Sequence, residues 1–268
     1  MLYNAKNGTV TVDNIEMDYI SFGNGSKNLV IIPGLGDGLR TVKGLAVSMA
    51  YMYRIFAKEY KVYMFSQSNN ISQGYTTKNM ADDIVEAMDC LNIKKADIVG
   101  VSMGGMVAQH IATDFPEYVG KLVLVATCPD ANNNVTSSVV PWIDMAQNNR
   151  YKDIMADNFK KLYSDEYLKK YRFMLPIATR IGKPESFERF IIMANACLSH
   201  NSTDKLSKIT APTLIIGGEK DQIVGVKASY QLNEMINKSG IYIYPQYGHA
   251  LYDEAKDFNK KILDFLNS

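Results

Sequence analysis

The stretch that decides the fold of this chain, residues 96–106, reads ADIVGVSMGGM. An apolar run leads into Ser102, which has Gly100 two places before it and Gly104 two places after it. A serine on a tight turn from strand to helix adopts strained backbone angles, and side chains at the two flanking positions would collide there. Glycine removes those side chains, so the sequence predicts a nucleophile elbow that presents the Ser102 hydroxyl above a sheet.

Outward from this stretch, strand-like and helix-like segments alternate from residue 29 onward. Apolar runs predict strands at 29–32, 62–65, 98–101, 122–126, 213–216 and 241–244, and apolar residues at helical spacing predict helices near 42–58, 79–91, 226–237 and 254–266. Before them, two alternating segments predict an antiparallel hairpin with its turn at Asp13–Asn14. The pattern is typical of an α/β fold with a mostly parallel, doubly wound sheet that has helices on both faces.

One interval breaks the alternation. Between Pro129 and Pro212 no strand-like run occurs, and several amphipathic helical patterns carry many aromatic residues. We expect a helical cap insertion at 130–208, and a core made of residues 1–129 and 209–268. The insertion would lie over the carboxyl ends of the strands as an apolar wall. The alternative is that its aromatic side chains only pack the insertion onto the core.

The composition excludes several classes of protein. The chain has 29 Lys and Arg residues and 28 Asp and Glu residues, a formal net charge of +1. It therefore lacks the surplus of positive charge that favours binding to nucleic acid or to an anionic membrane. Cys90, Cys128 and Cys197 are widely spaced and form no C-x-x-C pair, so we expect reduced, buried thiols and no metal site. The N-terminus lacks a basic region followed by an apolar one, which predicts a cytoplasmic protein.

A serine hydroxyl needs a base to take its proton, and the chain has three histidines. His110 lies eight residues beyond Ser102 on the same predicted helix, so its side chain points away from the elbow. His200 falls in the helical insertion. His249 follows the last predicted strand, at the sheet edge where the carboxyl ends of parallel strands meet. We therefore expect His249 to be the base.

A histidine that becomes charged needs a carboxylate to orient and stabilise it. Asp221 follows the strand at 213–216 and precedes His249 by 28 residues, about one strand–helix repeat. This spacing predicts that the two side chains lie on adjacent loops of one sheet edge. Asp130, after the preceding strand, is the main alternative for the acid, and Glu219 is a weaker one.

The oxyanion of a tetrahedral intermediate needs hydrogen-bond donors. We expect one from the backbone N–H of Met103, directly after the nucleophile, and one from Leu35 in the loop after the strand at 29–32. This loop reads PGLGDG at 33–38, which also suggests a dinucleotide-binding loop. Its G-x-G-x-G spacing differs from the G-x-G-x-x-G of that motif, so we favour the oxyanion role.

The segments GVSMGG at 100–105, GEKDQIV at 218–224 and GHA at 248–250, in the order Ser, Asp, His, resemble the α/β-hydrolase superfamily over nearly the whole chain. The resemblance implies hydrolysis through an acyl-enzyme, with no metal or organic cofactor and with a cap where the insertion lies. A serine nucleophile separates the chain from the haloalkane dehalogenase and epoxide hydrolase branches, which use aspartate.

Two departures from the superfamily concern substrate recognition. The superfamily commonly has His-Gly after the strand that precedes the oxyanion loop, and this chain has Pro33-Gly34. It often has an Asp-x-Arg-Gly turn after the next strand, where this chain has SQSNN at 66–70. Neither departure removes Ser102, Asp221 or His249. Both leave the shape of the oxyanion loop and the substrate open.

These residues predict a serine hydrolase of the esterase type, which cleaves small carboxylic esters with an apolar portion. The same side chains would serve hydrolysis of a C–C bond, a lactone or an amide, or acyl transfer to another acceptor. A ligand-binding receptor on the same fold is the alternative outside enzymes. The sequence specifies neither the acyl length nor the oligomeric state.

Overall fold

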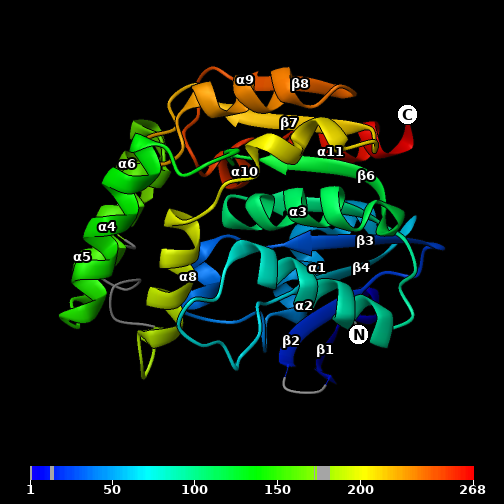
Figure 1. Ribbon diagram of the computed structural model, residues 1–268, viewed down its shortest axis with the longest axis horizontal. Coiled ribbons are helices and arrows are strands. Elements are labelled where there is room, and N and C mark those ends of the chain that lie inside the picture. The colour runs from blue at the N-terminus through cyan, green and yellow to red at the C-terminus, as the bar shows by residue number, and fades with distance from the viewer. Residues whose placement is uncertain (1, 13–14, 172, 174–181) are drawn as a thin grey trace.

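The computed structural model describes residues 2–12, 15–171, 173 and 182–268 (Figure 1). Among them, one eight-stranded sheet has the order β1-β2-β4-β3-β5-β6-β7-β8. The strands are β1 Lys6–Val12, β2 Ile15–Phe22, β3 Lys27–Ile32, β4 Tyr60–Phe65, β5 Ala96–Val101, β6 Val119–Val125, β7 Thr213–Gly218 and β8 Ser239–Tyr244. Pairs β1–β2 and β2–β4 are antiparallel and the others are parallel. The predicted fold class is confirmed, while the turn at Asp13–Asn14 lies outside the described residues.

Helices connect the parallel strands. They are α1 Ala46–Met52, α2 Thr77–Cys90, α3 Met103–Asp114, α4 Asn133–Gln147, α5 Tyr151–Leu162, α6 Asp165–Tyr171, α8 Glu188–Leu198, α9 Val226–Met235, α10 Leu251–Glu254 and α11 Phe258–Asn267. Short 3₁₀ turns include η2 Leu35–Gly38 and η3 Arg54–Phe56. Two predicted helices are interrupted, because Tyr53 leaves the helical conformation between α1 and η3, and Ala255 is extended between α10 and α11.

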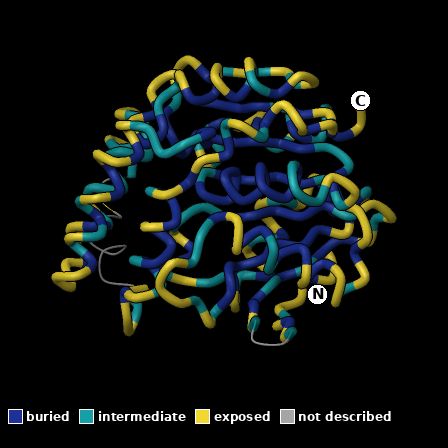
Figure 2. Tube along the Cα trace, viewed as in Figure 1, coloured by how far each residue is buried: buried dark blue, intermediate teal, exposed yellow. Residues whose placement is uncertain are grey.

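Both faces of the parallel sheet are buried. Along β3, Val30 and Ile32 belong to a core cluster that includes side chains of α2, α3 and α9. Leu29 and Ile31 belong to a second cluster, with side chains of α1 and α11. A strand covered on both faces needs a continuous apolar run rather than an alternating one, which explains the pattern from which these strands were predicted. Figure 2 shows the central strands as buried and the outer helical surfaces as exposed.

The strand arrows of β3, β6 and β7 point toward α4, α5, α6 and α8, which lie together at the left of Figure 1. These helices belong to the interval in which the sequence predicted helices and no strands. Helix α4 contacts α5 and α8, and α8 contacts η2, which directly follows β3. The interval is therefore attached to the core at the carboxyl ends of the strands, the edge at which the sequence places the functional residues.

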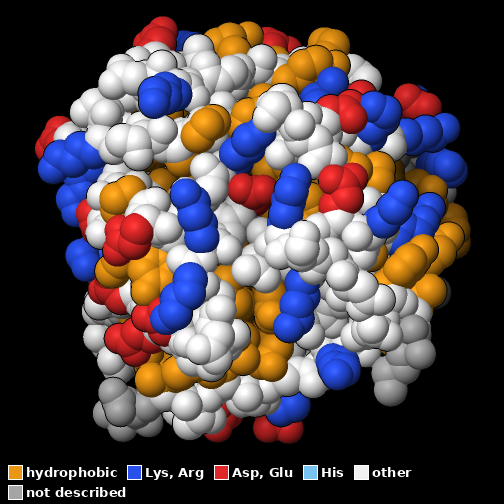
Figure 3. Space-filling view, turned by 90° about the vertical axis from the view of Figure 1, so that its right-hand side faces the viewer, with side chains coloured by type: hydrophobic (Ala, Val, Ile, Leu, Met, Phe, Trp, Pro, Cys, Tyr) orange, Lys and Arg blue, Asp and Glu red, His pale blue; other side chains and the backbone are white. Residues whose placement is uncertain are grey.

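Figure 3 shows the opposite side of the molecule, at the amino ends of the parallel strands. Positive and negative side chains are interspersed there with apolar ones, in keeping with the formal net charge of +1. Among the residues that the structure describes, every helix is too short or too polar to cross a bilayer. Cys128 and Cys197 are buried free thiols, as expected, but the prediction is wrong for Cys90, which is exposed at the end of α2.

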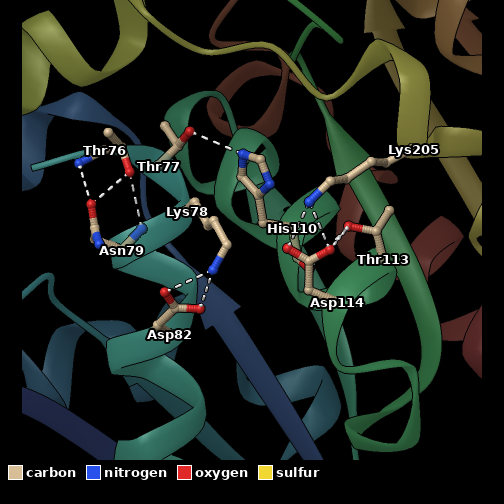
Figure 4. Close-up of polar contacts among 9 residues, drawn as sticks. All are labelled: Thr76, Thr77, Lys78, Asn79, Asp82, His110, Thr113, Asp114 and Lys205. Carbon is tan, nitrogen blue, oxygen red and sulfur yellow. Dashed lines mark hydrogen bonds and ion pairs between the residues drawn. The ribbon is translucent and has the colours of Figure 1, made fainter.

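Helices α2 and α3 are joined by a buried polar contact. A capping box between Thr76 and Asn79 begins helix α2. Thr77, the first residue of this helix, faces α3 (Figure 4). The Thr77 hydroxyl lies 3.2 Å from His110 Nε2 and 2.9 Å from His200 Nδ1. Burial lowers the pKa of His110, and burial together with His110 lowers the pKa of His200 to about 3. Both rings are therefore neutral packing groups on the side of α3 away from Ser102.

We expect this buried pair to make the fold sensitive to acid. The pKa of His200 lies near its ordinary value in the unfolded chain and near 3 in the folded protein. The contribution of His200 to the free energy of unfolding is therefore fully present above about pH 6.5 and declines as the pH falls below this value. The decline contributed by His200 is up to about 1.4 kcal/mol per pH unit. Urea unfolding at a series of pH values measures it. The variant H200Q should have a shallower decline, and an unchanged slope would contradict the assignment.

Candidate active site

Ser102 occupies the sharp turn between β5 and α3. Its φ of 55° and ψ of −120° are unusual for a residue with a side chain. A Cβ on Gly100 would lie 2.4 Å from the Gly104 carbonyl oxygen, and a Cβ on Gly104 would lie 2.1 Å from the Ile32 carbonyl oxygen. Neither position has room for a side chain. The local backbone is thus the elbow predicted from the sequence, and its glycines are required by close backbone approach.

Three side chains distant in sequence meet at this turn. The Ser102 hydroxyl oxygen lies 2.9 Å from His249 Nε2, and His249 Nδ1 lies 2.8 Å from an Asp221 carboxylate oxygen. The side chains of His249 and Asp221 are 3% and 2% exposed. Asp221 follows β7 and His249 follows β8, and these strands are parallel neighbours. The expected convergence at one sheet edge is therefore present as a continuous chain of hydrogen bonds.

The Asp221 carboxylate is held in its charged form. Burial alone would raise its pKa, but the nearby His249 ring and the hydrogen bonds that Asp221 accepts lower that pKa below its ordinary value. Besides His249, the backbone N–H groups of Ile223 and Val224 donate to the carboxylate at 2.8 and 3.0 Å. A fixed, ionised carboxylate orients the imidazole and stabilises the charge that the ring gains when it takes a proton.

The loop after β3 lies against the serine. A Cβ on Gly34 would lie 3.2 Å from the Ser102 Cβ atom, so the Pro33-Gly34 departure leaves this loop beside the nucleophile. Leu35 begins η2 and Met103 begins α3, so their backbone N–H groups have no acceptor within their own helices. The two groups that the sequence singled out as oxyanion donors therefore come from helix starts on either side of Ser102.

An ion pair that the sequence analysis missed ties this loop to α8. Asp37 lies in η2, and its carboxylate accepts from Arg189 Nη2 at 2.7 Å and from the Gln67 backbone N–H at 2.9 Å. Arg189 also donates to the carbonyl oxygens of Asp37, Gln67 and Ser68. The guanidinium group occupies the space beside the segment 66–70, where the superfamily often carries its own arginine. No local pattern reveals this contact, because its partners are about 150 residues apart in the chain.

Ser102 and His249 open into a cavity of about 370 Å³, within the range of roughly 300–1,000 Å³ typical of small-molecule sites. Its wall is mainly apolar and comes from α1, α3, α4 and α5: Met49, Met52, Met106, Val135, Val139, Trp142 and Leu162. Polar groups on the wall include Arg40, Asn158 and Asp253. The cavity therefore suits a small molecule with an apolar portion that reaches the Ser102 hydroxyl.

The other candidates from the sequence lie elsewhere. Asp130 forms an isolated backbone bridge with Asn201, and Glu219 is exposed, whereas Asp221 is the carboxylate that contacts His249. His110 and His200 pair with Thr77 instead of Ser102. In the described part of the chain, no three His, Cys, Asp or Glu side chains are grouped as metal ligands would be.

Fold, strand order and the chain of hydrogen bonds at the sheet edge together define a hydrolase of the α/β type. The chain belongs to this family: the family model described as "alpha/beta hydrolase fold" matches residues 27–256. A relative from Pseudomonas putida, 2-hydroxy-6-oxononadienedioate/2-hydroxy-6-oxononatrienedioate hydrolase 2, is 26% identical over 273 residues, which cover 94% of this chain and 92% of the relative.

Solved structures with the same fold differ in the activities that their names state. The enol-lactonase from Burkholderia xenovorans LB400 has a TM-score of 0.84 and 18% identity, and covers 97% of this chain and 100% of its own. An esterase from Exiguobacterium antarcticum has a TM-score of 0.78 and 19% identity, and covers 95% of this chain and 96% of its own. At such identities these structures establish the shared fold, and the reaction has to be argued from the site.

The packing of the elbow predicts a large loss of stability for G104A. The new Cβ would press on the Ile32 and Pro33 carbonyl oxygens, which belong to backbone that cannot move without displacing β3. We expect the free energy of unfolding to fall by roughly 3 kcal/mol or more, as measured by urea unfolding. The matched control is G240A in β8, where an added Cβ meets no atom within 4 Å. Equal stability of the two variants would contradict this account of the turn.

Proposed function

We propose that this chain is a serine hydrolase that cleaves carboxylic esters through an acyl-enzyme on Ser102. The observation that carries the proposal is the unbroken chain of hydrogen bonds from Asp221 through His249 to Ser102 at the wall of an apolar cavity. A serine becomes nucleophilic when a neighbouring base removes its proton, and a carboxylate behind the base keeps it correctly oriented. Membership of the α/β-hydrolase family, which is broader than the proposed ester hydrolysis, follows from the match to the family model.

In the first half of the reaction, His249 Nε2 takes the proton of the Ser102 hydroxyl as the oxygen attacks the ester carbonyl carbon. The carbonyl oxygen gains negative charge in the tetrahedral intermediate, and the backbone N–H groups of Leu35 and Met103 donate to it. The intermediate then expels the alcohol, which leaves with the proton held by His249. Ser102 is left as an ester of the acyl group.

In the second half, water takes the place of the alcohol. His249 removes a proton from the water, the resulting hydroxide attacks the acyl-Ser102 carbonyl, and the same two N–H groups stabilise the oxyanion. Collapse of the intermediate breaks the bond to Ser102 and returns the proton to its oxygen. The cavity wall favours an acyl or alcohol group with an apolar portion.

The second candidate is hydrolysis of a C–C bond, which the 26% identical relative favours. The substrate in that relative's name carries two carboxylates and no ester. On the cavity wall, Asp37 is paired with Arg189, which lies outside the lining and also donates to three carbonyl oxygens. Asp253 adds a negative charge to the wall. Arg40 also lies on the cavity wall, and it forms no ion pair with any residue that the structure describes. A dicarboxylate would find one cation, Arg40, for its two carboxylates and would be repelled by Asp253, so we favour the ester.

We also propose that helices of the segment 130–208 form a cap over the site. Helices α4 and α5 supply Val135, Val139, Trp142 and Leu162 to the cavity wall, and α8 holds the oxyanion loop through Arg189. Residues 172 and 174–181 of this segment lie outside the described residues. A cap of this kind would exclude bulk water while the ester is bound and would set the size of the acyl or alcohol group that fits.

Replacing the nucleophile tests the proposal directly. S102A should lower kcat for p-nitrophenyl esters by roughly 10⁴-fold or more, since no other group can form the acyl-enzyme. A series of esters with varied acyl length measures both turnover and preference. A fluorophosphonate should label Ser102 in the wild type and leave S102A unlabelled. Near wild-type turnover in S102A would refute the mechanism, and failure of the wild type to react with the probe would favour a ligand-binding receptor.

The role of Asp221 predicts a different kinetic pattern. In D221N the amide can no longer hold the imidazole in the tautomer that accepts the serine proton, so kcat should fall by roughly 10⁴-fold while KM changes little. Steady-state kinetics with the best ester of the series measures the two constants separately. Product analysis with a 2-hydroxy-6-oxo-dienedioate decides between the two reactions, because its cleavage at a rate above that of every ester would favour C–C hydrolysis.

A further inference from the structure

Two charged side chains on the cavity wall, Asp253 and Arg40, lack an ion-pair partner among the described residues. Asp37 is neutralised by Arg189 at 2.7 Å, and Asp221 is engaged by His249. Asp253 also lines the cavity, and no ion pair joins it to any Lys, Arg or His among the described residues. The other charge beside it is the carboxylate of Glu254, which is also negative. One wall of the cavity therefore presents an anion that has no counter-ion within the described part of the chain.

The position of Asp253 is fixed by its neighbours. It lies on α10, one helical turn beyond His249, so it belongs to the same segment as the proposed base. One of its carboxylate oxygens accepts from the Tyr163 hydroxyl at 2.9 Å. The second oxygen has no hydrogen-bond partner among the described residues, and solvent reaches the side chain. A bound molecule could therefore approach this second oxygen from the cavity.

Two tyrosine side chains of the cavity wall interact electrostatically with the Asp253 carboxylate. Tyr53 and Tyr252 both line the cavity, and burial together with the charge of Asp253 raises the pKa of each phenol. Burial raises the pKa of Asp253, the Tyr163 hydrogen bond lowers it, and Glu254 raises it. Asp253 is exposed at the cavity wall, and a carboxylate near neutral tyrosine rings is a favourable environment for a cation, which gains both ion pairing and contact with the aromatic rings.

Arg40 also lines the cavity, and it forms no ion pair with Asp253. Its charge acts on Tyr151, the first residue of α5, whereas Asp253 binds Tyr163, directly after the last residue of the same helix. A helix of 12 residues is about 18 Å long. The contacts of the two charged side chains therefore involve tyrosines at opposite ends of α5.

From this geometry we infer that Asp253 is a specificity-determining residue that selects substrates carrying a positively charged ammonium group. The ammonium group lies against the free Asp253 oxygen and the rings of Tyr53 and Tyr252, while the ester carbonyl lies at Ser102. The inference rests on the proposed ester hydrolysis, and it narrows the substrate class from apolar esters to cationic ones. Asp253 acts in binding and takes no part in bond cleavage.

Two isosteric pairs of esters test this inference, since the charge could lie in either half of the substrate. The first pair is butyrylcholine and 3,3-dimethylbutyl butyrate, followed by pH-stat titration. The second pair is the p-nitrophenyl esters of 4-(trimethylammonio)butyrate and 5,5-dimethylhexanoate. Within each pair a nitrogen replaces a carbon, so shape is conserved and charge changes. Assays at about pH 8 keep the Asp253 carboxyl ionised.

In the wild type, kcat/KM for the cationic member of at least one pair should exceed that of its neutral isostere by about tenfold or more. D253N keeps an oxygen that can accept from Tyr163 but removes the charge, so the ratio of kcat/KM between the cationic and neutral members should fall to about one. The matched control Y163F removes the hydrogen bond and keeps the charge, so it should retain the preference. A merely structural role of Asp253 would give D253N and Y163F the same effect.

Equal kcat/KM for the members of both pairs in the wild type would overturn the inference and leave the ester mechanism intact. So would a D253N variant that keeps the cationic preference. If no ester is cleaved, the proposed function fails, and titration calorimetry with hexyltrimethylammonium and hexyl sulfonate decides the inference separately. Tighter binding of the cation to the wild type, lost in D253N, supports it, and tighter binding of the anion refutes it.

Discussion

The strand-to-helix turn at Ser102 is the constraint on which the rest of the site depends. A positive φ at a serine costs on the order of 1–3 kcal/mol and persists only where the surroundings allow no alternative. Those surroundings are backbone: the Gly104 Cα lies against the carbonyl oxygens of Ile32 and Pro33. The same residues lead from β3 into the loop that carries Leu35. One packing contact therefore fixes the proposed nucleophile, Ser102, and one of the proposed oxyanion donors together.

The sequence predicted most of this arrangement because it follows from chain order. In a parallel sheet, loops after successive strands open at one edge, so residues after β5, β7 and β8 meet without any knowledge of side-chain packing. Ser102, Asp221 and His249 could each be found by this rule. Asp221, and not Asp130, is the carboxylate that contacts His249, and the Ile223 and Val224 N–H groups of a local turn hold it in place.

Other features depend on contacts between distant segments, and the sequence could not predict them. The Asp37–Arg189 pair joins η2 to α8, and neither residue lies in a pattern that names its partner. The ends of the helices near 42–58 and 254–266 depend on single backbone angles at Tyr53 and Ala255 rather than on apolar spacing. The exposure of Cys90 follows from its place at the carboxyl end of α2, where a cysteine faces solvent instead of the core.

The segment that carries His249 also joins the core to the helices over the site. The Ala250 N–H donates to the Leu162 carbonyl at 2.9 Å, and Glu254 accepts from the Ser164 N–H at 3.0 Å. The segment is therefore held against the end of α5, where Tyr163 binds Asp253. Because α10 is rigidly attached to both sides, a group bound at Asp253 has a fixed position relative to the His249 ring. Recognition of a substrate group there would orient the ester carbonyl toward Ser102. Specificity and chemistry would then be linked through the short segment from His249 to α10 rather than through a movement of the site.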